Sequence, residues 1–308
     1  MSDKPRSIKS LLASYNSDTI KNIKQLAFKG GVENRDVYNI TPPFKVRRTW
    51  YLAGRVEMRD DELGTKTVFF KKTKRQRKWR VIPLAPVFNL QDPFVTRIKG
   101  SLVFGGVQTK QKGKKIRFRT LFYRGKDVDN LSKFSRGPWG MKDIRLVELG
   151  DGRIGVFTRP RGGKAGRGKI GFRIIDYLKD IRPRMLSRVD IIKGMFARGE
   201  WGGVNEAHVL KNGKLGVLGH ISKFNKDGNI KKRYYYPMTF LFDPETGEFS
   251  NMKILVSRSD LPETESKRDD LYYVIFPGGL RRKENGRAEL YAGVSDAKSY
   301  SITIKDPF

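Results

Sequence analysis

Apolar residues alternate with polar ones along most of the chain. From about Trp50 onward, short segments rich in Val, Ile, Phe and Tyr are separated by turns that contain glycine. Alternation with a period of two is typical of β-strands with one buried face, and helical spacing is nearly absent from this part of the sequence. The body of the chain is therefore predicted to be all-β.

The N-terminal stretch has a different pattern. Its apolar residues recur at helical spacing and fall on one helix face: Ile8, Leu11, Leu12 and Tyr15. Asp18 can cap a second short helix, whose apolar positions are Ile20, Ile23 and Leu26. We expect residues 1–37 to form a short helical extension and residues 38–308 to form the β domain.

A strand–turn–strand unit recurs five times within this β domain. The units begin at Trp50, Thr96, Val147, His208 and Arg281. Three of them turn at dipeptides that tolerate positive φ: Asp151-Gly152, Asn212-Gly213 and Asn285-Gly286. The turn glycines Gly100, Gly152, Gly213 and Gly286 lie 52 to 73 residues apart, which is enough for a four-stranded blade and a loop. Five units predict a five-bladed β-propeller.

The innermost strands of a propeller surround a central cavity, so polar residues beside them are candidate site residues. Arg55 and Glu57 lie on the same face of one strand. They are either site residues or a surface ion pair. Asp92 precedes Pro93, which favours an extended backbone, and its apolar sequence neighbours would raise its pKa. Such a carboxyl suits a general acid, although Asp-Pro also begins ordinary turns.

The third unit contains Lys142, Asp143 and Arg159. Arg159 ends an apolar strand, where its guanidinium either pairs with a blade carboxylate or binds a phosphate or carboxylate of a ligand. The glycine-rich basic loop that begins at Arg161 lacks Walker spacing and a following helix, so it is weak evidence for a phosphate site.

The fourth unit holds Asn205 and Glu206 and both histidines of the chain, His208 and His220. A buried histidine is more often a core residue than a catalyst, but two in one hairpin favour a functional role. No third ligand has the spacing of a metal site, so we expect no metal. Asp296 ends the fifth unit among small residues, where it either meets a ligand or caps a turn.

Composition adds information about partners. The 64 basic and 32 acidic residues give a net charge of +32, which attracts polyanions. The one dense basic run, Lys71 to Lys78, is typical of a solvated loop, and a basic propeller that binds RNA or acidic proteins remains an alternative. The chain has no cysteine, no apolar run long enough for a membrane helix and no signal-peptide pattern, so we expect a cytoplasmic location.

The ordered motifs resemble two enzyme families. Asp92-Pro93, Lys142-Asp143, Thr158-Arg159-Pro160, Gly219-His220 and Tyr291–Asp296 resemble the β-mannoside phosphorylases of glycoside hydrolase family 130. The phrases QDPFVTRIKGSLVFGGV, PWGMKDIRLVELGDGRIGVFTRP, GVLGHI and LYAGVSDA are more similar still to glycosyltransferase family 108, which contains β-1,2-mannan mannosyltransferases and phosphorylases.

The resemblance implies an inverting enzyme that transfers mannose reversibly between a β-1,2-mannoside and phosphate, with mannose 1-phosphate as the product and no cofactor. Nucleotide-activated mannose is a donor for some relatives, and a β-mannoside hydrolase is the enzymatic alternative. The resemblance also implies that Asp92 is the general acid and that phosphate is bound by Arg159 and His220. Phosphate is already a nucleophilic anion, so such an enzyme needs no second carboxylate to activate water.

The remaining candidates are assigned by motif position. The family 130 phosphorylases have a lysine before the fourth-blade histidine, and this sequence has no counterpart at that position. The residues that could take its place are Lys142, Arg145 and Lys169. The sugar-binding candidates are Arg55, Glu57, Asp143, Asn205, Glu206, Tyr235 and Asp296, where Tyr235 stands for one of three consecutive tyrosines. The acceptor, the mannan length and the oligomeric state stay open.

Overall fold

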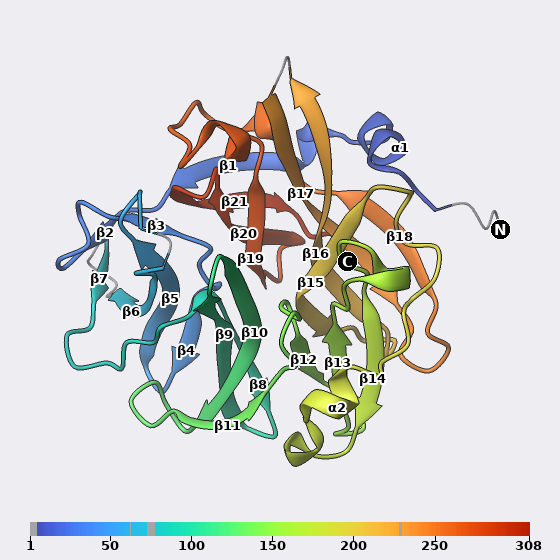
Figure 1. The fold of residues 1–308 in the computed structure, drawn as a ribbon, viewed down its shortest axis with the longest axis horizontal. Helices are drawn as coiled ribbons and strands as arrows, with labels where there is room; N and C mark the ends of the chain where they lie inside the picture. The colour runs from blue at the N-terminus through green and yellow to red at the C-terminus, as the bar shows by residue number, and fades with distance from the viewer. Residues whose placement is uncertain (1–4, 62, 73–77, 228–229) are drawn as a thin grey trace.

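The protein forms five β-sheets arranged around a central axis (Figure 1). The structure is a computed structural model that describes residues 5–61, 63–72, 78–227 and 230–308, so most of the basic run, residues 73–77, lies outside the described residues. Each predicted strand–turn–strand unit is an antiparallel hairpin within one sheet. The predicted five-bladed β-propeller is confirmed.

The first three blades come from the first 175 residues. Blade one has the order β2-β7-β6-β5-β3 with β4 beside β5, and its strands are β2 (Phe28–Lys29), β3 (Asp36–Tyr38), β4 (Phe44–Val46), β5 (Thr49–Glu57), β6 (Lys66–Lys72) and β7 (Trp79–Val81). Blade two contains β8 (Gln91–Ile98), β9 (Ser101–Lys112), β10 (Lys115–Gly125) and β11 (Ser132–Arg136). Blade three contains β12 (Arg145–Glu148), β13 (Ile154–Thr158) and β14 (Gly171–Ile175).

The last two blades complete the ring. Blade four contains β15 (Trp201–Val209), β16 (Leu215–Asp227), β17 (Ile230–Phe242) and β18 (Phe249–Ile254). Blade five contains β19 (Ile275–Arg282), β20 (Arg287–Val294), β21 (Lys298–Lys305) and, outermost, β1 (Ile20–Gln25).

The described residues also form short helices. The α-helices are α1 (Ile8–Ala13) and α2 (Pro183–Leu186). The 3₁₀ helices are η1 (Ser17–Thr19), η2 (Gly163–Ala165), η3 (Leu178–Asp180), η4 (Arg258–Asp260) and η5 (Asp269–Leu271).

The N-terminal segment differs in part from the prediction. The first predicted helix is confirmed as α1, which Ser7 caps and which buries Ile8 and Leu11 in a core shared with blade four. The second predicted helix is wrong, because the segment that carries Ile20 and Ile23 is strand β1, paired antiparallel with β21. This pairing closes the ring between the two ends of the chain.

The hydrophobic core lies in the wedges between blades. Leu102, Phe104 and Leu121 of blade two pack with Phe69 of blade one, for example. Since each sheet is buried on both faces in this way, its innermost strand is held rigidly at the axis. No helix among residues 5–61, 63–72, 78–227 and 230–308 is long and apolar enough to cross a membrane.

Candidate active site

Three polar residues near the axis have a left-handed backbone. Asn39, Asp92 and Asp143, from blades one, two and three, have φ values of 45°, 49° and 58°. Positive φ is uncommon for residues other than glycine, and such strain clusters at functional sites. The prediction that Pro93 holds Asp92 in an extended conformation is therefore wrong.

Asp92 lies in a polar environment supplied by neighbouring blades. Asn39 Nδ2 donates a hydrogen bond to Asp92 Oδ1 at 2.8 Å, Arg55 Nη1 lies 3.4 Å from the same oxygen, and Lys142 Nζ lies 3.5 Å from Oδ2. Burial raises the pKa of Asp92, but the charges of Lys142 and Arg55 and the Asn39 hydrogen bond hold it below its ordinary value. The predicted rise in pKa is wrong, because the cations around Asp92 are distant in sequence.

Arg55 and Glu57 form a buried pair rather than a surface one. Glu57 accepts a hydrogen bond from Arg55 Nε at 2.9 Å and others from Tyr38, Thr65 and Lys267. Its side chain is fully buried. Lys267 was not predicted as a site residue, since it lies between strands in a segment without hydrophobic periodicity.

Arg159 pairs with a carboxylate of its own blade. Its Nη1 donates to Asp143 Oδ2 at 2.7 Å, and its Nε donates to the Gly202 carbonyl at 2.8 Å. A Cβ on Gly168 would lie 2.6 Å from Arg159 Nε, so the glycine-rich loop covers this guanidinium closely. Burial raises the pKa of Asp143, but Lys142 and Arg159 outweigh it and hold the pKa far below its ordinary value.

His220 is buried beside Asn205 and Tyr235. Its Nδ1 lies 2.8 Å from Asn205 Oδ1, and its ring stacks on Tyr235 with centroids 5.5 Å apart. Burial lowers the pKa of His220 to about 3, so the imidazole is neutral at physiological pH. Tyr235, whose hydroxyl accepts from Trp201 Nε1 at 3.2 Å, is thus the tyrosine placed at the site, whereas Tyr236 belongs to the core.

The substitutes considered for the unmatched lysine lie in different places. Lys142 reaches Asp92, and the buried Arg145 donates through Nε to the Asn205 carbonyl at 2.9 Å. Lys169 instead donates to the Phe196 carbonyl at 3.3 Å. Lys142 is therefore the lysine that the structure brings to the central carboxylate.

Glu206 is not brought into the central cluster. It accepts a hydrogen bond from the Leu280 amide at 2.6 Å, and its Oε2 lies 3.1 Å from His208 Nε2. Glu206 therefore links blade four to blade five.

Asp296 stands in a tight turn between β20 and β21. Ser295 and Asp296 have φ values of 55° and 50°, and the Ala297 amide donates to the Val294 carbonyl at 3.1 Å. Positive φ at both central positions is the type I′ turn, which Asn-Gly suits better than Ser-Asp. Burial raises the pKa of Asp296 to about 6, with Arg55 and Lys267 opposing the shift and Asp92 adding to it.

The centre has polar atoms without protein partners. Four such buried atoms of the described site residues are Asn39 Oδ1, Asp143 Oδ1, Asn205 Nδ2 and His220 Nε2. Buried polar atoms are normally hydrogen-bonded, and the hydroxyls of a sugar could supply these partners.

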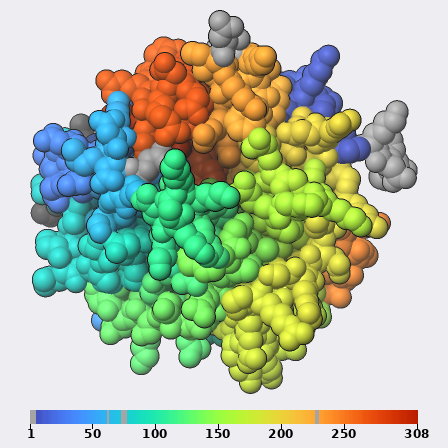
Figure 2. Space-filling view, viewed as in Figure 1, coloured from blue at the N-terminus to red at the C-terminus, as the bar shows by residue number. Residues whose placement is uncertain are grey.

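The charges of the centre favour an anion. Its cations are Arg55, Lys142, Arg145, Arg159 and Lys267, and its carboxylates are Glu57, Asp92, Asp143 and Asp296. The cations outnumber the carboxylates by one, and by more when Asp296 is protonated. Figure 2 shows that the molecule is hollowed near the middle of the face in view.

The fold and these residues define a five-bladed β-propeller with a central site suited to polyhydroxylated and anionic ligands. Residues 13–308 match the family described as "Protein of unknown function (DUF1861)". A search of curated proteins found no match. Solved structures extend this comparison.

MPT-4, a mannose phosphorylase from Leishmania mexicana in complex with a phosphate ion, is 34% identical, with a TM-score of 0.90 over 98% of this chain and 93% of that one. MPT-1, a GDP-Man-dependent mannosyltransferase from the same organism, is 32% identical, with a TM-score of 0.89 over 98% and 94%. The β-1,2-mannobiose phosphorylase from Listeria innocua shares the fold at 15% identity, with a TM-score of 0.65 over 95% and 96%. The chain belongs to the DUF1861 family and, with the Leishmania proteins, to glycosyltransferase family 108, as its motifs predicted.

Proposed function

We propose that the protein is an inverting mannoside phosphorylase and mannosyltransferase that acts on β-1,2-mannosides. In one direction phosphate attacks the anomeric carbon and mannose 1-phosphate is released, and in the other a mannoside is elongated. The observation that carries the proposal is the excess of positive charge around Asp92 and Asp143, because a phosphate anion would balance it. The identity to MPT-4 supports the same reaction.

In this mechanism Asp92 gives a proton to the leaving glycosidic oxygen. Its low pKa in the unliganded protein depends on Lys142, whose side chain is 30% exposed and can therefore turn toward an incoming phosphate. Phosphate would both draw this cation away and add negative charge near Asp92. Both effects raise the pKa of Asp92 toward that of a general acid.

Phosphate would be held by Lys142, Arg159 and His220. Arg159 is already oriented by Asp143, so it loses little side-chain entropy when a ligand binds. In neutral His220, Nδ1 donates to Asn205 Oδ1, so Nε2 carries no proton and would accept a hydrogen bond from the hydroxyl of a protonated phosphate. The sugar hydroxyls would then be bound by Arg55, Asp143, Asn205, Tyr235 and Asp296, with Glu57 fixing Arg55.

Hydrolysis has less support from the geometry. A hydrolase needs a carboxylate that activates water. Glu57 is held by four side chains and has no freedom to do so, which leaves Asp296 as the candidate. No corresponding observation favours a nucleic-acid-binding role over catalysis.

One incubation tests the proposal. The purified protein is mixed with β-1,2-mannobiose in the presence and absence of phosphate, and β-1,4-mannobiose serves as the linkage control. We expect mannose 1-phosphate and mannose from the β-1,2 substrate only when phosphate is present. Equal amounts of mannose with and without phosphate would show that the protein is a hydrolase. A further reaction supplies GDP-mannose as the donor, and the absence of product in every reaction would contradict the catalytic role.

A further inference from the structure

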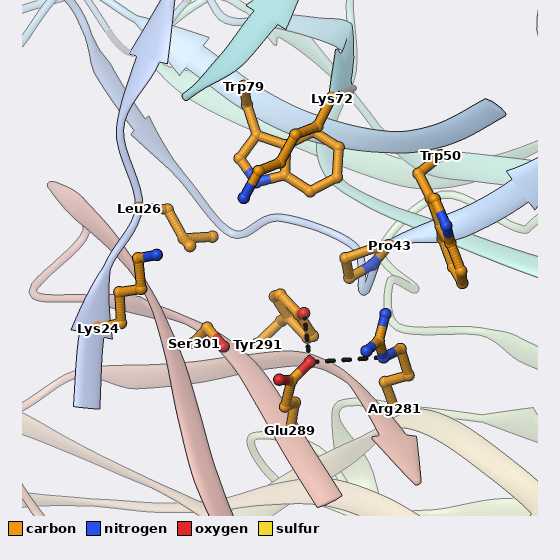
Figure 3. Close-up of a pocket in the computed structure, with 10 residues that line it drawn as sticks. All are labelled: Lys24, Leu26, Pro43, Trp50, Lys72, Trp79, Arg281, Glu289, Tyr291 and Ser301. Atoms are coloured by element: carbon orange, nitrogen blue, oxygen red, sulfur yellow. Dashed lines mark hydrogen bonds and ion pairs between the residues drawn. The ribbon is translucent and has the colours of Figure 1, made fainter. Parts of the chain in front are cut away.

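A second cavity lies between blades five and one. Its volume is about 320 Å³ (Figure 3), and its lining residues include Lys24, Lys72, Trp50, Arg281 and Glu289. None of its lining residues belongs to the central cluster. Trp50 and Glu57 are seven residues apart on β5, so this cavity is separated from the centre by about 23 Å along the strand.

The carboxylate in this cavity already has its partners. Glu289 Oε1 lies 2.8 Å from Lys283 Nζ, while Oε2 accepts from the Tyr291 hydroxyl at 2.9 Å and lies 3.4 Å from Arg281 Nε. Glu289 is therefore held by these three donors, and its charge also acts on Lys72.

Two lysines of the cavity face each other without such a partner. Neither Lys24 nor Lys72 forms an ion pair with any carboxylate of the described chain. Burial lowers the pKa of Lys72 and the charge of Lys24 lowers it further, while the charge of Glu289 acts in the opposite direction. Figure 3 shows both amino groups directed toward the same space. An anion placed there would relieve their repulsion.

The walls beside the lysines are apolar and aromatic. Trp50 is 37% exposed. The other uncharged lining residues are Leu26, Pro43, Trp79, Tyr291 and Ser301, and Lys72 Nζ lies 5.8 Å from the centre of the Trp79 ring. Arg281 stacks on the Trp50 ring at 5.2 Å and fixes its orientation. Ligand sites usually measure about 300–1,000 Å³, so this cavity suits a small molecule rather than a long glycan.

We infer that this cavity is an accessory binding site for a sugar phosphate. The phosphate lies between Lys24 and Lys72, and the sugar ring lies against Trp50. The inference goes beyond the proposed function, because it needs neither Asp92 nor Arg159. Strand β5 passes from this cavity to the centre, where it carries Arg55 and Glu57. Strand β20 leads from the cavity to the turn that contains Asp296.

Calorimetric titration with mannose 1-phosphate tests the inference. We expect two classes of site in the wild-type protein. Lys72→Met should weaken one class at least tenfold and leave phosphorolysis of β-1,2-mannobiose unchanged, and Lys24→Ala should act in the same direction. Lys21→Ala is the matched control, since Lys21 is an exposed lysine on the same strand outside the cavity.

The arms of this experiment separate the inference from the catalytic proposal. If the wild-type protein shows no turnover but Lys72→Met still removes one class of binding site, the accessory site is supported and the proposed function is contradicted. Identical isotherms for wild type and all cavity variants overturn the site. Inorganic phosphate and methyl mannoside are titrated separately, and phosphate that binds as tightly as mannose 1-phosphate overturns the role of the sugar. Melting curves identify misfolded variants, in which case Trp50→Ala replaces Lys72→Met.

Discussion

Lys142 Nζ lies 3.5 Å from Asp92 Oδ2 and is the most exposed cation near that carboxylate. Its side chain is 30% exposed, compared with 8% for Arg55. A buried arginine is fixed by its packing, whereas a partly exposed lysine can change partners at small cost. The protonation state of Asp92 is therefore expected to respond to whatever binds Lys142.

Asp92→Asn should abolish turnover and preserve the fold. Asparagine keeps the size of the side chain and its Asn39 contact but cannot donate the proton, so kcat should fall by about 10²–10⁴. Mannose 1-phosphate formation is the measurement, with circular dichroism as the check of folding. Asp129→Asn, at an exposed aspartate of the same blade, is the matched control. Activity within threefold of wild type in a folded Asp92→Asn protein would remove Asp92 from the chemistry.

Asp296→Asn should change how stability depends on pH. The folded-state pKa of Asp296 is raised to about 6 from an ordinary 3.8, so its favourable contribution is complete below pH 3.8 and is lost as pH rises through 6. Above pH 7 the neutral asparagine should raise the free energy of unfolding by at most about 3 kcal/mol, with little change near pH 4. Urea unfolding at both pH values measures this. Equal destabilisation at pH 4 and pH 8 would show that the carboxylate is needed structurally.

The two histidines should titrate very differently. Burial lowers the pKa of His220 to about 3, whereas the charge and hydrogen bond of Glu206 outweigh burial and raise the pKa of His208 above 6.5. Imidazole NMR signals between pH 5 and 8 should therefore show one titrating ring and one constant ring. Because the chain has only two histidines, His208→Asn assigns both signals. A His220 ring that titrates near pH 6 would contradict its buried, neutral state.

Gly203→Ala should impair the use of phosphate, although Gly203 itself has no side chain that could bind phosphate. A Cβ at Gly203 would lie 2.9 Å from Arg159 Cδ and 3.0 Å from His220 Cε1, so both side chains must shift. Misplacement of this size costs up to about 10²-fold in rate. The apparent KM for phosphate should rise, while that for mannobiose changes little. Gly150→Ala is the control, because its Cβ would meet no atom within 4 Å. Unchanged phosphate kinetics would place the anion away from Arg159 and His220.

Local sequence signals were sufficient for the blades but not for every strand. Hairpins such as the one at Asp151-Gly152 depend on neighbouring residues alone, so the pattern predicts them directly. Strand β1 was predicted as a helix because Ile20 and Ile23 are three residues apart. A register shift between Ile20 and Asn22 brings both isoleucines to the less exposed side of the strand, which simple alternation does not anticipate.

The site was predicted by motif, but its electrostatics could not be. Leu90, Pro93 and Phe94 beside Asp92 in the sequence are apolar, whereas the cations that lower its pKa come from two other blades. Lys267 meets Glu57 across 210 positions of sequence, and no periodic pattern marks it. Pairings of this kind follow from ring closure, which a single sequence does not specify.

The pairing of β1 with β21 also has a consequence for the order of folding. Ile20 lies opposite Ile304, and contacts so distant in sequence form slowly because they carry a large loop-closure cost. We expect the fifth blade to close last, with late amide protection of Ile302 in pulsed hydrogen exchange. Until then an intermediate would present the unpaired edge of β21 beside an incomplete site, and edge strands of this kind readily pair with other chains. Aggregation during refolding should therefore be most sensitive to substitutions in β1, although that strand lies far from the chemistry.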